Sequence, residues 1–270
     1  MRLSLLLAAV LLAAPVQAQN LQSHCIALAD NAFEQITFAQ FGEDLTPEEV
    51  RISYVDHSTF LIETPSGRGI ATDFAGFIGV DVIPDVVTMN NAHSTHWTPN
   101  PDPRIEHVLR GWGDESGPAE HRLTLDDEIL IRNVTTDIRS GFEGRVENGN
   151  SIFIFEVAGL CLGHLGHLHH EPTEQQYAAI GRLDVVMVPV DGGMTLDVAS
   201  MINVVERLRS SLVLPMHWFG GSTLQAFLGG MSDEFEVEVT DTSSVVVTLR
   251  DLPRTPTIRV LRPQFLDQDF

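Results

Sequence analysis

Residues 89–97 have the sequence MNNAHSTHW, and this stretch decides the fold. It follows the apolar run VIPDVVTM (82–89), which is typical of a short buried strand. His93 and His96 lie three residues apart just beyond that run. Imidazole is the commonest protein ligand for zinc, but histidines are also frequent in ordinary polar loops. Whether these two histidines belong to a metal site therefore depends on whether other segments of the chain supply further ligands.

Two further apolar runs end in histidine. The run VAGLCLG is followed by His164 and, three residues later, by His167, and SLVLPM is followed by His217. A third run, DVVMVPV (184–190), ends at Asp191. Because α/β folds build their sites just beyond the ends of buried strands, we expect these side chains to converge.

The remaining pattern indicates a layered α/β arrangement. Alternating residues in 50–73, with Pro-Ser-Gly at 65–67, predict a strand hairpin. Residues 97–119, rich in Pro, Gly and Trp, predict a long loop. A capping box opens a predicted helix over 173–183, and helical spacing of apolar residues predicts a second helix over 196–209.

The N-terminus predicts export. Residues 1–18 have Arg2, an apolar stretch and a small-residue ending, the layout of a secretory signal peptide, so we expect a secreted, periplasmic protein. The 252 residues left after cleavage are expected to form an N-terminal segment (19–48) and one domain (49–270). Their net charge is −22, because the −21 of the full chain includes Arg2 and no acid in the signal. This charge disfavours nucleic acid and anionic membrane as partners, and no later apolar run is long enough to span a membrane.

The chain has two cysteines, Cys25 and Cys161. An oxidising compartment permits a disulfide between them. Cys161, however, lies in the apolar run VAGLCLG, which favours a buried thiol. The pairing stays open at this point.

The chain resembles the metallo-β-lactamase-fold hydrolases, and among them the ascorbate-6-phosphate lactonase-like branch, over about residues 50–252. DHSTFLI (56–62) is similar to the family's Gly-His-Ala/Ser-Thr element, and Asp73 stands where the family's hairpin ends in Asp. Three later segments are similar to its metal motifs: NAHSTH (91–96) to His-x-His-x-Asp-His, HLGH (164–167) to His-x-Gly-Asp, and PMH (215–217) to the final Pro-x-His. The resemblance implies a four-layer αββα sandwich.

The resemblance also implies a metal site, in altered form. Family members commonly bind two metals, but here Asn91 replaces a ligand histidine, Thr95 replaces the motif's acid and His167 replaces the bridging acid. One ion, held by three imidazoles, is therefore expected instead of two. Zinc is the first choice, although histidine ligation also suits copper, nickel or iron. The predicted metal-binding residues are His93, His96, His164, His167 and His217, with His96, His167 and His217 the expected set for the single ion.

We therefore expect an exported hydrolase that uses a metal-activated water on a small-molecule lactone, amide or ester. Thr95 cannot orient that water as a carboxylate would, and Asp73, Asp56 and Asp191, each near a strand end, could replace it. Asp73 and Asp191 are the predicted catalytic residues, although Asp191 also fits a turn. His57 and Trp97 are candidates to line the pocket, but a structural histidine with satisfied hydrogen bonds is the favoured interpretation of His57. The alternative function is a non-catalytic descendant of the fold that binds a metal ion or small ligand.

Overall fold

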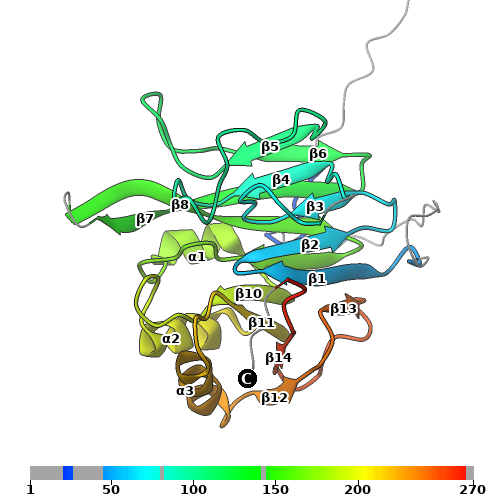
Figure 1. The fold of residues 1–270 in the computed structure, drawn as a ribbon. Coiled ribbons are helices and arrows are strands. Elements are labelled where there is room, and N and C mark those ends of the chain that lie inside the picture. The colour runs from blue at the N-terminus through cyan, green and yellow to red at the C-terminus, as the bar shows by residue number, and fades with distance from the viewer. Residues whose placement is uncertain (1–20, 27–44, 80–81, 141–143, 266–270) are drawn as a thin grey trace, which may run out of the picture.

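The computed structural model describes residues 21–26, 45–79, 82–140 and 144–265. The predicted signal peptide lies outside these residues, as does most of the predicted segment 19–48. Two β-sheets lie face to face, as Figure 1 shows, and the larger hydrophobic core includes side chains of both sheets and of the helices. Within the described chain, no helix has the length and apolar character needed to cross a bilayer.

The first sheet has six strands in the order β13-β1-β2-β3-β4-β5. Its strands are β1 (Val50–Asp56), β2 (Thr59–Glu63), β3 (Gly69–Ala71), β4 (Val86–Met89), β5 (His107–Arg110) and β13 (Ser244–Val247). The predicted hairpin is confirmed, because β2 and β3 pair antiparallel across 64–68. The prediction that 97–119 is all loop was wrong: its four residues HVLR are β5, which pairs in parallel with β4.

The second sheet has eight strands in the order β12-β14-β11-β10-β9-β8-β7-β6. Its strands are β6 (Arg122–Leu125), β7 (Ile129–Ser140), β8 (Gly144–Val157), β9 (Leu160–His164), β10 (Val185–Pro189), β11 (Leu212–Met216), β12 (Glu236–Val239) and β14 (Thr257–Val260). β6 to β9 pair antiparallel, and β9, β10, β11, β14 and β12 run in parallel.

Three helices connect strands of this second sheet and lie beside β10 and β11 in Figure 1: α1 (Glu174–Ile180), α2 (Val198–Leu208) and α3 (Gly221–Met231). The capping box predicted at Thr173 is confirmed, since its side chain accepts from Gln176 N and the Gln176 side chain accepts from Thr173 N. α1 ends earlier than predicted because Gly181 takes a positive φ of 75° there. α2 begins after Asp197, whose side chain accepts from Ser200 N.

The two faces of the six-stranded sheet bury different clusters. Val86 points into the core between the sheets, and Val87 belongs to a second cluster on the outer face. Among the described residues, this outer face is covered by loop side chains, such as Phe74, Ile78 and Ile105, and not by a helix. The α/β class and its two facing sheets are as predicted, while the helices of the described chain all belong to the eight-stranded side.

Cys25 and Cys161 form a disulfide, with Cα atoms 5.9 Å apart across 136 residues of sequence. The favoured interpretation of Cys161 as a buried thiol was therefore wrong. The segment that carries Cys25 is held beside β9 by tertiary hydrogen bonds, which have no signature in the local sequence. Glu156, buried on β8, accepts from Ser23 Oγ (2.6 Å) and His24 N (2.9 Å). This carboxylate anchors the short segment that carries Cys25.

Candidate metal centre

Six strands that run in two parallel sets deliver the site. In the six-stranded sheet, β1, β3 and β4 share one direction, and in the eight-stranded sheet β9, β10 and β11 are parallel. The residues that follow their carboxyl ends are His57, Asp73 and His96 in the first sheet, and His167, Asp191 and His217 in the second. The convergence expected from the strand ends is thus what the structure shows.

The turn after β1 is clamped to the end of β11. The backbone carbonyl of His57 accepts from the Tyr54 hydroxyl (2.7 Å) and from His217 N (2.8 Å), which joins the two sheets at the site. His57, Asp73 and His217 have φ of 49°, 48° and 59°. Such left-handed conformations are uncommon outside glycine and gather at functional sites, where the surrounding structure must hold them.

His96 has one nitrogen committed and one open. Its Nδ1 contacts the Asp73 carboxylate and lies 3.2 Å from Ser58 Oγ. Burial opposes ionisation of Asp73, but His96 outweighs it and holds the pKa of that carboxyl below its usual value. Since a carboxylate only accepts, the Nδ1 of His96 carries the hydrogen of this contact, which leaves Nε2 as the nitrogen that could bind a metal. That Nε2 is buried and has no hydrogen-bond partner in the described part of the chain.

His217 is held in the same way. Its Nδ1 donates to Asp191 Oδ2 at 2.8 Å. Asp191 Oδ1 accepts from the backbone of Gly193, Met194 and Thr195, so this residue both shapes the turn and orients the histidine. Burial opposes ionisation of Asp191, but the bonds from His217 and Thr195 keep its pKa low. The His217 Nε2 is therefore the nitrogen of this ring that could bind a metal.

His57 completes a set of three. Its Nε2 is buried and lacks a partner among the described residues, so the interpretation of His57 as a satisfied structural histidine was wrong. Burial, His217 and His96 lower the pKa of His57 to about 3, which keeps the ring neutral. One nitrogen each from His57, His96 and His217 lie within 4.8 Å of one another. Imidazole nitrogens are ligands that zinc and similar ions prefer, and carboxylates orient two of these three rings, so these residues fit a divalent metal.

His167 and His93 lie at the side of this set. The His167 ring centroid is 4.5 Å from that of His96 and 5.4 Å from that of His217, and its Nδ1 meets His169 Nε2 at 2.7 Å. Burial lowers the pKa of His167 to about 2. His93 is exposed, stacks 5.9 Å from His167 and places Nδ1 3.1 Å from Thr95 Oγ1. Both are therefore neighbours of the unpartnered nitrogens.

His164, also predicted as a ligand, has both ring nitrogens engaged. Its Nε2 donates to the Ser58 carbonyl (2.7 Å), and its Nδ1 accepts from Gly166 N (3.1 Å). The Asn91 amide donates to Gly149 O at 2.8 Å. His164 thus braces the turn that carries His57, and the structure does not bring it into the set of open nitrogens.

Comparison with known proteins agrees with this architecture. Residues 51–217 match the family described as the beta-lactamase superfamily domain, and the chain belongs to that superfamily. It is 30% identical over 94 residues to a UPF0173 metal-dependent hydrolase of Carboxydothermus hydrogenoformans, which covers 34% of this chain and 42% of the relative. It is 20% identical over 202 residues to a UPF0173 protein of Pyrococcus abyssi, covering 66% and 89%. The match to the first relative thus spans less than half of that protein's length.

Solved structures show the same fold. A Thermotoga maritima protein, assigned as a Zn-dependent hydrolase of the metallo-β-lactamase superfamily, superposes with a TM-score of 0.57 at 25% identity and covers 80% of this chain and 100% of its own. A metallo hydrolase from Ignicoccus hospitalis gives a TM-score of 0.53 at 18% identity over 80% and 96%, a likeness of fold alone. The ascorbate-6-phosphate lactonase-like branch stays a prediction.

Proposed function

We propose that the protein is a metal-dependent hydrolase that holds one divalent ion on His57, His96 and His217. The observation that supports it most strongly is the convergence of three imidazoles whose nitrogens lie within 4.8 Å of one another, two of them oriented by buried carboxylates. Three histidines with an open fourth position are a ligand set of catalytic zinc. Zinc is therefore the first candidate, and the same donors also accept other transition metals.

A single ion is favoured over two. The family's first metal position needs nitrogen donors at Asn91, His93 and His164, but Asn91 and His164 are engaged with Gly149, Ser58 and Gly166, which leaves His93. One exposed imidazole is too few donors to hold a second ion tightly.

A zinc ion held there would act as a Lewis acid and would supply an activated water at neutral pH. Asp73 and Asp191, the candidate catalytic residues, serve this site from behind the histidines. Asp73 Oδ1 accepts from Asn90 N at 3.0 Å, and its other oxygen meets His96. We therefore assign both carboxylates as positioning residues that fix the ring orientation and offset the charge of the ion.

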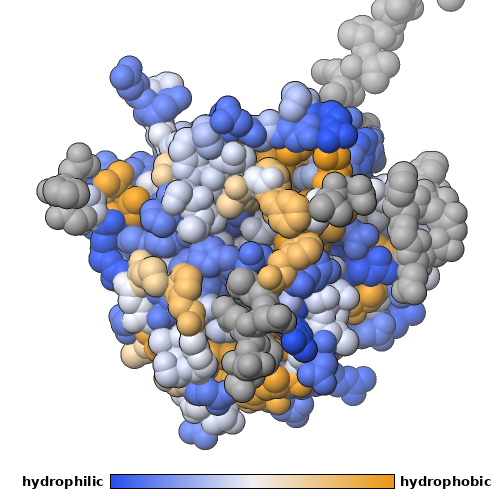
Figure 2. Space-filling model, viewed as in Figure 1, coloured by the Kyte–Doolittle hydropathy of each residue, from blue (hydrophilic) through white to orange (hydrophobic). Residues whose placement is uncertain are grey.

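The proposed substrate is a small lactone, ester or amide with an apolar portion. Phe219 follows His217 by two residues, is 56% exposed, and places its ring 5.1 Å from His217 and 5.3 Å from His57. Figure 2 shows apolar residues gathered in patches on an otherwise hydrophilic face. An exposed aromatic ring against two site histidines offers apolar contact to a group beside the reacting bond.

A non-catalytic metal binder is the second candidate. It is favoured by Thr95, exposed where the family has a carboxylate, and by the engagement of Asp73 and Asp191 with their histidines. A binder and a hydrolase would hold the same ion, so only turnover separates them.

Export to the periplasm is also proposed. The signal-like residues 1–18 and the Cys25–Cys161 disulfide support it, because structural disulfides persist in oxidising compartments. Expression of the full chain with subcellular fractionation tests it: the periplasmic fraction should contain a chain that begins at Gln19. A full-length chain retained with the cytosol would contradict export.

Metal analysis of the purified, untagged protein is the first test of function. We expect about one zinc per chain, lost in His57→Ala, His96→Ala and His217→Ala and kept in His107→Ala, a histidine of β5 outside the site. Chelator-sensitive turnover of lactones, esters or amides would identify the enzyme, and metal without turnover would identify the binder. Two tightly held ions, or full occupancy in His57→Ala, would contradict the proposed site.

A further inference from the structure

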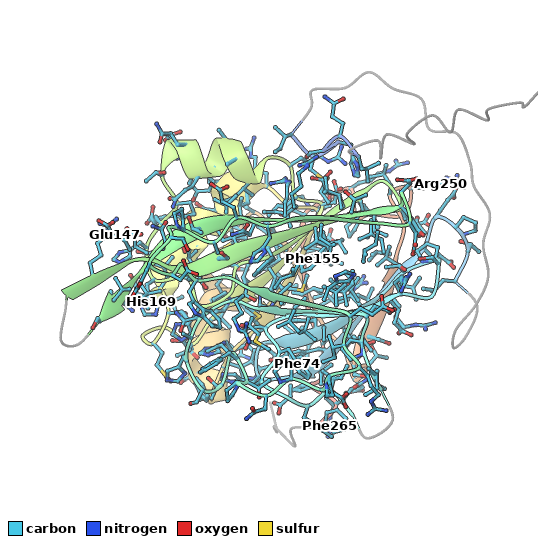
Figure 3. The ribbon with its side chains drawn as sticks, turned by 90° about the horizontal axis from the view of Figure 1, so that it is seen from above. Phe74, Glu147, Phe155, His169, Arg250 and Phe265 are labelled. Carbon is cyan, nitrogen blue, oxygen red and sulfur yellow. A yellow bond between two sulfur atoms is a disulfide. The ribbon has the colours of Figure 1, made fainter. Side chains whose placement is uncertain are left out.

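His167 stands where relatives with the His-x-Gly-Asp motif have the bridging acid, and the expectation from sequence is that it binds the metal. The hydrogen bonds around it lead to a different role. His167 lies 4.5 Å from His96 between ring centroids, and behind it stands His169, near the β7–β8 hairpin (Figure 3). The question is which of the two His167 nitrogens carries the hydrogen.

The answer begins at a backbone amide. Arg139 N, in β7, donates to His169 Nδ1 at 2.7 Å. A backbone N–H can only donate, so His169 Nδ1 must be the unprotonated nitrogen, and the ring is neutral because an imidazolium has no acceptor. Its hydrogen is therefore on Nε2. The Arg139 side chain is fixed as well, since it donates to the Thr195 carbonyl at 2.6 Å.

The tautomer of His169 fixes that of His167. His169 Nε2 lies 2.7 Å from His167 Nδ1, so the His169 hydrogen is donated and His167 Nδ1 accepts it. His167 is consequently also neutral, with its hydrogen on Nε2. The backbone N–H of His167 donates to Asn150 Oδ1 at 2.8 Å, which holds its main chain in place. In this arrangement Nε2 has an N–H to donate and no lone pair for a metal ion.

We propose that His167 is a fixed hydrogen-bond donor to the carbonyl oxygen of the substrate beside the metal, not a ligand of the metal, and that His169 and the Arg139 amide set its tautomer. This inference rests on the proposed function. One nitrogen each of His57, His96 and His217 converge within 4.8 Å, whereas His167, with its ring 4.5 and 5.4 Å from those of His96 and His217, presents the Nε2 hydrogen that its bond to His169 assigns. The protein itself therefore supplies a hydrogen-bond donor, the Nε2–H of His167, beside the proposed metal.

The reaction needs such a donor at one moment. When the oxygen of water forms a bond to the carbonyl carbon, the carbonyl π pair moves onto the carbonyl oxygen. That pair returns as the bond to the leaving oxygen or nitrogen breaks, and the proton lost by the water goes to the leaving atom. The N–H of His167 contributes a hydrogen bond to the carbonyl oxygen while it is negative and keeps its own proton throughout. Donors placed in this way are worth about 10²–10³-fold in kcat.

Long-range ¹H–¹⁵N spectra of the full chain labelled at histidine test the tautomer directly. We expect His167 and His169 both to carry hydrogen on Nε2, without zinc and with one equivalent of it. Loss of the His167 Nε2 hydrogen on addition of zinc would show coordination and overturn the proposal. This readout does not depend on turnover, so it decides the tautomer even if the proposed hydrolase activity fails.

Variants separate donor from ligand. His167→Ala is expected to keep about one zinc per chain and to lose about 10²–10³-fold in kcat. Loss of the metal together with activity would make His167 a ligand and overturn the proposal while leaving the proposed function intact. Absence of zinc from the parent chain would instead show failure of the proposed function.

Two variants of His169, one that can replace its hydrogen bonds and one that cannot, test its positioning role. His169→Gln offers a carbonyl to Arg139 N and an N–H to His167, so it should keep the Nε2–H form of His167 and most of the activity. His169→Leu offers neither, so His167 should populate both neutral tautomers in the spectrum, with a lower kcat and unchanged zinc content. A single Nε2–H form of His167 in His169→Leu would overturn the assignment of His169.

Discussion

Each open nitrogen of the site depends on a partner on the far side of its ring. Asp73 fixes His96, and Asp191 fixes His217 with a 2.8 Å bond. A carboxylate behind an imidazole favours one tautomer, prevents rotation of the ring and makes the opposite nitrogen a stronger donor to metals. His169 behind His167 sets the opposite outcome, a ring that offers a hydrogen. The hydrogen-bond partner behind each imidazole therefore decides whether the nitrogen on the opposite side of the ring can bind a metal or donates a hydrogen bond.

Replacement of Asp73 tests this dependence. Asp73→Asn keeps the shape of the side chain but removes the charge and lets an N–H face His96. We expect zinc affinity to fall about 10–100-fold, as for other residues that orient a metal-bound histidine. Competition with a chelating indicator measures it. Asp102→Asn, a change of a loop carboxylate paired with Arg104, is the control and should bind like the parent, whereas equal affinity in Asp73→Asn would contradict the role given to Asp73.

Single residues were predictable to the extent that their neighbours in sequence define them. His217 directly follows the buried strand β11, and His96 lies in the loop after the buried strand β4, so the sequence indicated both. His57 was missed because its function depends on a buried nitrogen without a partner in the described chain, a tertiary property. Its place just after a strand was the signal that could have found it. His164 also follows a buried strand, as a metal ligand would, but its Nε2 donates a hydrogen bond to the backbone carbonyl of Ser58, 106 residues away in sequence.

At the scale of elements, the turn after β9 depends on one glycine. Gly166 has φ +61°, and a Cβ there would lie 2.5 Å from Asn90 Nδ2 and 2.6 Å from Asn150 Oδ1. Gly166→Ala should therefore cost at least about 2 kcal/mol of unfolding free energy, from backbone strain and from the clash together. Urea unfolding measures the change.

Gly193→Ala is the matched control for Gly166→Ala. Gly193 lies in the turn after β10, and a Cβ on it meets no atom within 4 Å. We expect this variant to unfold within about 0.5 kcal/mol of the parent, as surface substitutions usually do. Equal stability of the two alanine variants would refute the packing argument for the turn after β9.

The anchor of the N-terminal segment to β8 predicts a pH dependence. Burial opposes ionisation of Glu156, but the bonds from Ser23 and Arg132 outweigh it and lower the pKa of this carboxyl below its ordinary value of 4.5. Because the pKa is lower in the folded protein, the ionised group contributes stability above pH 4.5, and this contribution is lost as pH falls through the folded value. The urea midpoint should therefore decrease on acidification below about pH 4.5.

Glu156→Gln isolates this contribution. It leaves the buried Arg132 without its charge partner at 2.8 Å, so at pH 7 we expect a loss of about 3 kcal/mol and a weaker pH dependence below pH 4.5 than in the parent. Glu63→Gln, which removes a partly exposed partner of Arg51, should change stability by less than about 1 kcal/mol. A pH profile of Glu156→Gln that parallels the parent would assign the acid sensitivity to other carboxylates.

Elements with strong local signals were predicted, and those stabilised only by partners were not. The capping box at Thr173 and the periodic apolar residues of α2 identify their helices from sequence alone. β5 has only four residues between proline- and glycine-rich segments, and it exists as a strand because β4 lies beside it. The Cys25–Cys161 bond, which spans 136 residues, likewise depends on tertiary contacts.

At the scale of the whole molecule, the site lies across the joint between the two sheets. His57 and His96 follow strands of the six-stranded sheet, and His217 follows β11 of the eight-stranded sheet. The direct bond across this joint from His217 N to the His57 carbonyl is 2.8 Å long. One ion bound to all three side chains would therefore link the sheets as well as provide a reaction centre.

This link predicts that metal controls global stability. Free zinc at 100 times its dissociation constant should stabilise the folded chain by about 2.7 kcal/mol, because the unfolded chain does not preserve the site. For a chain of this size that corresponds to a rise in Tm of about 5–10 °C, reversed by a chelator, and scanning calorimetry measures it. His57→Ala cuts the link from the six-stranded side, so its Tm should be nearly insensitive to zinc, while His107→Ala should respond like the parent. An equal zinc response in His57→Ala would show that the ion binds without His57, and therefore that the six-stranded sheet contributes to the site through His96 alone.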